Sequence, residues 1–114
     1  MELYSVEQQR AIVDHLELAA DVRSRTRGLI GHPSLSPGQG LMIHPCRWIH
    51  TFGMSFPIDV IYVGREWRIV ALSENLRPRR VDRPVLRAHF AVEMAAGAIH
   101  RMGLRVGEHV ELRT

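Results

Sequence analysis

Short apolar runs, separated by glycine, proline and charged residues, recur along the chain and predict a mainly β protein. Residues 58–63 are apolar except for Asp59, which is typical of a strand buried on both faces. Residues 64–67 predict a turn, and residues 68–73, which are apolar from Ile69 to Leu72, predict the returning strand of a hairpin. Apolar positions alternate over residues 88–94, which predicts a half-buried strand.

The same pattern predicts strands at residues 3–6, 12–18, 41–44 and 109–112, the first two paired as a hairpin. Two short helices are expected, at residues 21–30 after the N-cap Asp21 and at residues 98–102. The regular helices that connect parallel strands are missing from the pattern. We therefore expect a compact antiparallel β-sandwich or partly closed barrel of about seven short strands with two short helices.

The size and composition of the chain are those of one compact domain, which we expect to span residues 1–114. No apolar run approaches the roughly 20 residues needed to cross a bilayer, so we expect no membrane insertion. The only cysteine, Cys46, cannot form an internal disulfide, and the first residues do not resemble an export signal. These features predict a cytoplasmic protein.

All 15 basic residues are arginine, and the net charge is +3, which by itself identifies no partner. Five arginines lie within residues 77–87, where a surface loop or weak edge strand is expected. No aromatic residue lies among these arginines, so the pattern favours a solvated loop and no specific nucleic acid as partner. Weak nucleic-acid binding through this loop is one alternative function.

The densest polar chemistry lies between His44 and Met54, shortly before Asp59. In an extended segment, Cys46 and His50 lie about 13 Å apart, too far for a nucleophile and its base. A small enzyme that uses Cys46 or His50 in a pocket with Asp59 is therefore an alternative that requires a bend. The spacing of these histidines and the cysteine matches no common zinc site, so we expect no metal and no cofactor.

Asp59 interrupts an apolar run, so we expect a buried, ionised carboxylate held by donors from residues 50–54 or from Arg27. Glu93 has the same ambiguity between a structural and a ligand-binding role, because it lies in another largely apolar stretch. The candidate ligand-binding residues are Arg27, Cys46, His50, Thr51, Asp59 and Glu93.

Four stretches of the sequence resemble the bacterial and archaeal domain of unknown function family 192. They are residues 27–31, residues 38–41, residues 46–63 with Pro57-Ile58-Asp59, and residues 92–97 with Val92-Glu93-Met94. The resemblance implies a compact, mainly β fold and no established activity. The family motifs include Arg27, His50, Asp59, Glu93 and Gly97, without an assigned catalytic role.

Residues 49–54 differ from the Trp-Met-Lys-Asn-Thr stretch of many family members, which often carry an export signal. With Cys46, the chain resembles a cytoplasmic branch whose members are sometimes encoded near pilus or secretion genes, which implies a pilus- or secretion-related context. We therefore expect a noncatalytic accessory module that binds a small molecule or a protein through a polar pocket around residues 46–59.

Overall fold

The computed structural model describes residues 1–19, 29 and 31–114. The helix predicted at residues 21–30 and the candidate residue Arg27 lie outside these described residues. Within them, the regular structure consists of eight strands and one short helix. They are β1 (Glu2–Ser5), β2 (Arg10–Val13), β3 (His15–Ala19), β4 (Gln39–Ile43), β5 (Ile58–Gly64), β6 (Ile69–Leu76), β7 (Ala88–Ala95), α2 (Ala98–Met102) and β8 (Val110–Arg113).

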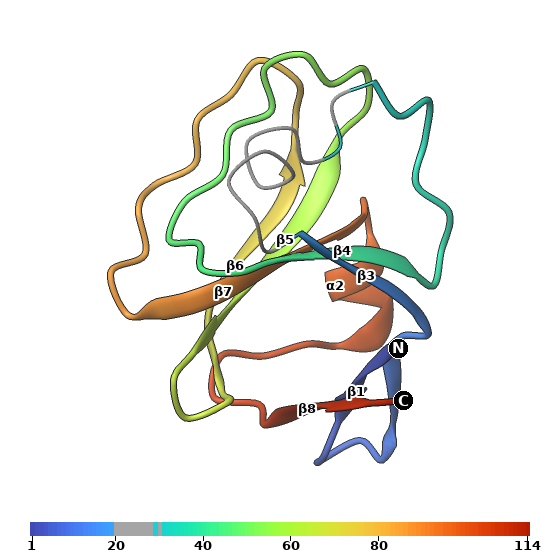
Figure 1. Ribbon diagram of the computed structural model, residues 1–114, viewed down its shortest axis with the longest axis vertical. Coiled ribbons are helices and arrows are strands. Elements are labelled where there is room, and N and C mark those ends of the chain that lie inside the picture. The colour runs from blue at the N-terminus through green and yellow to red at the C-terminus, as the bar shows by residue number, and fades with distance from the viewer. Residues whose placement is uncertain (20–28, 30) are drawn as a thin grey trace.

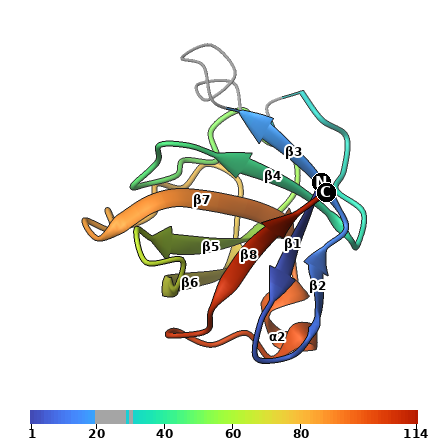
Figure 2. The same cartoon turned by 60° about the horizontal axis from the view of Figure 1, so that its bottom comes forward.

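The strands form two separate sheets, which confirms the mainly β prediction and favours a sandwich over a closed barrel (Figure 1). The smaller sheet has the order β2-β1-β8, and both chain ends lie beside it (Figure 2). The larger sheet has the order β3-β4-β7-β5-β6. The helix α2 forms where predicted and ends at Gly103, but no helix of the described residues is long and apolar enough to cross a membrane.

The single strand predicted at residues 12–18 is wrong, because the chain divides there into β2 and β3, which belong to different sheets. At the break, the N–H groups of Asp14 and His15 both donate to the carbonyl of Gly38, each at 3.0 Å. Gly38 has φ +86, and an added Cβ would lie 2.6 Å from Asp14 Oδ1, so glycine is required there. Beyond the break β3 runs parallel to β4, which corrects the expectation of a wholly antiparallel fold.

β7 is a central strand rather than the half-buried strand predicted at residues 88–94, since it pairs with both β4 and β5. Phe90, Val92 and Met94 face the smaller sheet and α2, together with Ile61 of β5. We call this side of the larger sheet the inter-sheet face. The opposite side carries Leu41, Ile43, Val60, Tyr62 and Ala91 in a second apolar cluster, and we call it the loop-covered face.

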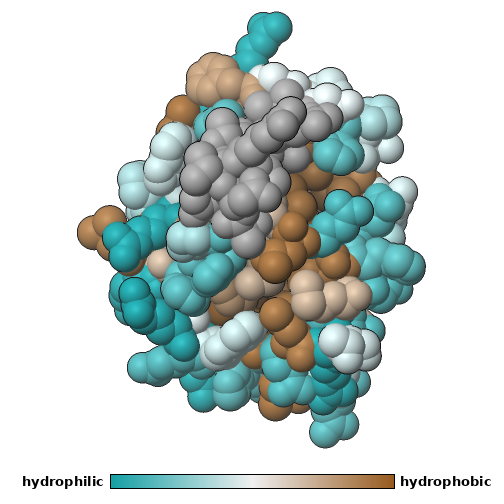
Figure 3. Space-filling model, viewed as in Figure 1, coloured by the Kyte–Doolittle hydropathy of each residue, from teal (hydrophilic) through white to brown (hydrophobic). Residues whose placement is uncertain are grey.

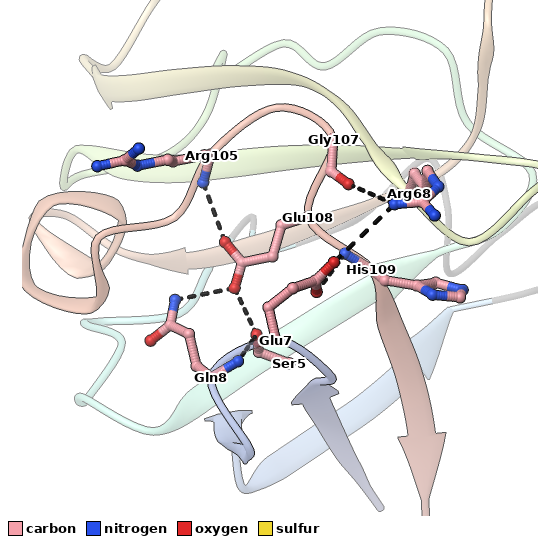
Figure 4. Close-up of polar contacts among 8 residues, drawn as sticks. All are labelled: Ser5, Glu7, Gln8, Arg68, Arg105, Gly107, Glu108 and His109. Carbon is pink, nitrogen blue, oxygen red and sulfur yellow. Dashed lines mark hydrogen bonds and ion pairs between the residues drawn. The ribbon is translucent and has the colours of Figure 1, made fainter.

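A buried carboxylate joins the beginning of the chain to its end. Glu108 Oε2 accepts hydrogen bonds from the Ser5 hydroxyl and, at 2.8 Å, from Gln8 Nε2. Its Oε1 accepts the Arg105 N–H at 3.1 Å (Figure 4). Because both oxygens have donors, this carboxylate connects the β1–β2 turn to the loop before β8 without an unpaired buried atom.

Asp59 is fully buried in β5, as predicted, but its donors are not those expected from residues 50–54. Oδ1 accepts the N–H of Asn75 at 2.8 Å. Oδ2 accepts the N–H groups of Gly97 at 3.1 Å and Ile99 at 2.9 Å, at the beginning of α2. The carboxylate therefore fixes the end of β6 and the turn between β7 and α2 to the inter-sheet face.

We predict that Asp59→Ala lowers the free energy of unfolding by at least about 3 kcal/mol, because it leaves three backbone N–H groups without their acceptor. Denaturant unfolding of the purified variant measures this loss. Asp14→Ala removes an exposed carboxylate of the same type and should change stability by about half a kcal/mol or less. Equal midpoints for the two variants would contradict the anchoring role of Asp59.

Candidate functional site

Two long connections cover the larger sheet and pair with each other, and their traces run side by side in Figure 1. Thr51 N–H donates to the Arg80 carbonyl at 2.8 Å, and Asp82 N–H donates to the Ile49 carbonyl at 2.9 Å. These bonds flank an isolated antiparallel bridge between His50 and Val81. We call the paired segments 47–52 and 79–85 the loop ribbon.

Thr51 points inward from the loop ribbon and is fully buried. Its hydroxyl donates to the Arg77 carbonyl at 2.5 Å and accepts the Arg80 N–H at 2.9 Å. The hydroxyl thus acts both as donor and as acceptor, toward the backbone of Arg77 just before the second ribbon segment and of Arg80 within it. Thr51 therefore holds the two segments together. Its hydroxyl has a structural role and is not directed at a ligand site.

Beneath the ribbon lies a second set of polar groups, centred on Tyr62 and Asp82. Asp82 Oδ2 accepts the Tyr62 hydroxyl at 2.7 Å and the Ser73 hydroxyl at 2.5 Å. Burial, followed by the hydrogen bond to Asp82, raises the pKa of Tyr62 far above its ordinary value, with smaller contributions from Cys46 and Glu93. Tyr62, Asp82 and Glu93, which lie on the loop-covered side of the larger sheet, form what we call the inner cluster.

Glu93 is the unusual member of the inner cluster. Its side chain is 2% exposed, and its neighbours across the sheet are Leu41 and Val60. No described residue makes a hydrogen bond to Oε1. Burial among apolar residues raises the pKa of Glu93 to about 8, so its carboxyl is mostly protonated at neutral pH and can donate through O–H.

Cys46 and His50 lie at the edge of this region. The Cys46 thiol is half-buried and donates to the Trp48 carbonyl at 3.1 Å. The His50 ring lies between Trp48 and Phe52, with centroid distances of 5.9 and 6.0 Å, and its buried Nδ1 has no hydrogen-bond partner among the described residues.

Five of the six sequence-predicted site residues lie in the described part of the chain, and these five do not form one pocket. Cys46, His50, Thr51 and Glu93 lie on the loop side of the larger sheet, whereas Asp59 lies on the inter-sheet face with its oxygens occupied by backbone donors. A catalytic group that combines Cys46 or His50 with Asp59 is therefore not assembled. Within the described ranges, no three His, Cys, Asp or Glu side chains gather in a way that could hold a metal ion.

A groove of about 530 Å³ lies beside the β5–β6 turn, at one end of the loop ribbon. Its lining includes four arginines and one glutamate, and the groove was not predictable from the sequence because these residues come from distant segments. The lining residues are Arg47, Gly64, Arg65, Glu66, Arg68, Ile69, Val70, Leu86, Arg87, Ala88, Val106 and Gly107. We call it the arginine groove.

The backbone and neighbouring side chains position the groove arginines. Arg68 Nη1 donates to the Gly107 carbonyl at 2.8 Å and lies 3.9 Å from Glu7 Oε2 (Figure 4). At Gly64, an added Cβ would lie 3.2 Å from the Arg87 carbonyl, so glycine allows the β5–β6 turn to approach the beginning of β7 closely. Burial lowers the pKa of His89, and the nearby His44 and, to a smaller extent, Arg65 lower it further.

We predict that Glu93→Gln stabilises the protein at pH 8 by on the order of a few kcal/mol but changes stability little at pH 4. The pKa of Glu93 rises from 4.5 to about 8 on folding, so the folded state binds the extra proton between these values. The wild-type protein therefore loses stability as pH rises from 4.5 to 8, and glutamine removes this loss. Thermal unfolding across this pH range measures it.

The matched control is Glu17→Gln, which changes an exposed glutamate of β3. It should keep the pH profile of the wild-type protein. If Glu93→Gln also kept that profile, Glu93 would be ionised and solvated in the folded state at neutral pH, against the geometry of the inner cluster.

No curated protein is significantly similar to the chain. A protein of unknown function from Novosphingobium aromaticivorans has the same fold, with a TM-score of 0.85, 20% identity and coverage of 98% of this chain and 84% of that one. A "putative transcription regulator" from Sinorhizobium meliloti has a TM-score of 0.77 and 22% identity, with coverage of 96% of this chain and 89% of that one. At such identities these likenesses show the fold alone. Residues 4–112 match the family DUF192, described as "Uncharacterized ACR", and the chain belongs to this family.

Proposed function

We propose that this DUF192 domain is a noncatalytic binding module and that the arginine groove holds an anionic ligand. The supporting observation is the convergence of Arg47, Arg65, Arg68 and Arg87 on one groove whose lining has a single carboxylate, that of Glu66. The groove's lining therefore has an excess positive charge, which an anion would neutralise.

The size and chemistry of the groove fit a small ligand that has two or more anionic groups. Its volume of about 530 Å³ lies within the range of ordinary ligand sites. Guanidinium groups bind phosphate and carboxylate through paired hydrogen bonds, and Arg68 is already held in place by the Gly107 carbonyl. Leu86 and Val106, both exposed apolar residues, add an apolar part to the same lining.

The groove is a better candidate than the inner cluster for this role. Glu93 is almost fully buried, whereas all four groove arginines are exposed to solvent. Arg47 also belongs to the segment 46–59 around which the sequence predicts a polar pocket. A cytoplasmic location and a pilus- or secretion-related setting stay predictions from the sequence and its resemblance.

Titration calorimetry with inorganic tripolyphosphate tests this function. We expect saturable binding that the double change Arg65→Gln and Arg87→Gln weakens at least about tenfold, because each charge-assisted hydrogen bond contributes roughly 1.5–3 kcal/mol. The affinity should also fall as salt concentration rises.

Arg101→Gln with Arg113→Gln is the control, since it removes the same charge from α2 and β8, away from the groove lining. It should change the dissociation constant less than about twofold. An equal loss in the control pair would mean that tripolyphosphate responds only to net charge, and the groove would not be its site.

A further inference from the structure

The outer side of the loop ribbon carries a row of aromatic rings. Ile49 and Thr51 point inward and are buried, so the alternation of side chains turns Trp48, His50 and Phe52 outward. Trp48 is 50% exposed and Phe52 is 51% exposed. Ring contacts through His50 connect them, which gives a continuous aromatic row over about 13 Å of extended chain.

The second segment of the ribbon adds positive charge beside these rings. His50 is paired with Val81, so Arg83 lies across from Trp48 and Arg79 lies across from Phe52. Arg79 and Arg83 are both exposed there, whereas Arg80 pairs with Thr51 and lies on the other side of the ribbon, with Asp82. From the sequence, the arginine-rich loop lacks aromatic neighbours, but the fold brings them from residues 48–52.

The acidic residue of this segment does not offset that charge on the outer surface. Asp82 is turned inward, where Oδ2 accepts the hydroxyl groups of Tyr62 and Ser73. The outer side of the ribbon therefore presents rings, an apolar Val81 and guanidinium groups, but no carboxylate. The molecular edge formed by these loops shows exposed hydrophobic atoms among hydrophilic ones (Figure 3).

The ribbon is continuous with the arginine groove. Val85 N–H donates to the Arg47 carbonyl at 2.7 Å, and Arg47 lines the groove. Leu86 and Arg87, which directly follow the ribbon, line it as well. A long anionic ligand could thus follow one surface from Phe52 along the ribbon into the groove.

We propose that the loop ribbon binds single-stranded nucleic acid without sequence preference. Bases stack on Trp48 and Phe52, while phosphates pair with Arg79 and Arg83. Stacking favours single strands, because their bases present ring faces that a duplex hides, and every base has such a face. The excess of arginine selects a polyanion over a neutral ligand. Only the extension of the strand into the groove rests on the proposed function.

Fluorescence anisotropy with labelled oligothymidylate and oligouridylate of about 12 nucleotides tests the proposal. We expect Trp48→Leu and Phe52→Leu each to weaken binding at least about fivefold, since stacking on one aromatic ring has an effect of this size or larger. Tyr4→Leu is the matched control, because Tyr4 lies in β1 of the other sheet, and it should leave binding unchanged. Circular dichroism confirms that each variant is folded.

A second measurement reports the stacking directly. The chain has two tryptophans, so in Trp67→Phe the only remaining indole is that of Trp48. We expect oligonucleotide, but not tripolyphosphate, to quench its fluorescence. Unchanged fluorescence at saturating oligonucleotide would overturn the proposal, as would equal affinity for a duplex of the same length or for heparin.

The two proposals fail separately in these experiments. If tripolyphosphate binds to the groove but Trp48→Leu leaves oligonucleotide binding intact, the ribbon proposal is overturned and the groove proposal stands. If the double variant Arg65→Gln and Arg87→Gln binds tripolyphosphate normally but Trp48→Leu weakens oligonucleotide binding, the groove proposal is overturned and the ribbon proposal stands. The thymidylate and uridylate arms show whether DNA or RNA is preferred, and either preference supports the single-strand proposal.

Discussion

Burial of β7 on both faces is the constraint on which the rest of the structure depends. Its inter-sheet face packs against the smaller sheet and α2, but its other face has no second sheet to cover it. Tyr62 and Ala91 are nevertheless fully buried there, because the long connections lie over them. These connections must be held in place without a regular sheet, and the buried Thr51 and the half-buried Asp82 do this through side-chain hydrogen bonds.

The strands were predictable from periodicity, but their partners were not. The apolar pattern continues through residues 12–18, so nothing local indicates that the chain changes sheets at Asp14. The break depends on the carbonyl of Gly38, which is distant in sequence. Asp59 was recognisable as a buried carboxylate because of its apolar neighbours, yet its donors were missed because backbone N–H groups leave no mark in a sequence.

The functional surfaces were missed for a related reason. Arg47 and Arg65 look like isolated surface charges in the sequence, and Arg87 ends the arginine-rich stretch 77–87. Only the fold brings the three to one groove. Similarly, the aromatic residues 48–52 and the arginines of 79–83 are separated by two strands of the larger sheet. Sequence reasoning did find His50 and Glu93, which among the described residues are the two with unpaired buried side-chain atoms, because a polar residue among apolar neighbours is a local signal.

The fold explains why positions 48, 50 and 52 of the loop ribbon are exposed, but it does not explain why they are aromatic. Burial of Ile49 and Thr51 forces positions 48, 50 and 52 outward, so the fold accounts for their exposure. It does not account for their chemistry, because polar residues at these exposed positions would serve the fold equally well. Polar residues would also leave less apolar surface in contact with water. Two half-exposed aromatic rings beside exposed arginine side chains are therefore better explained by a ligand than by the stability of the ribbon.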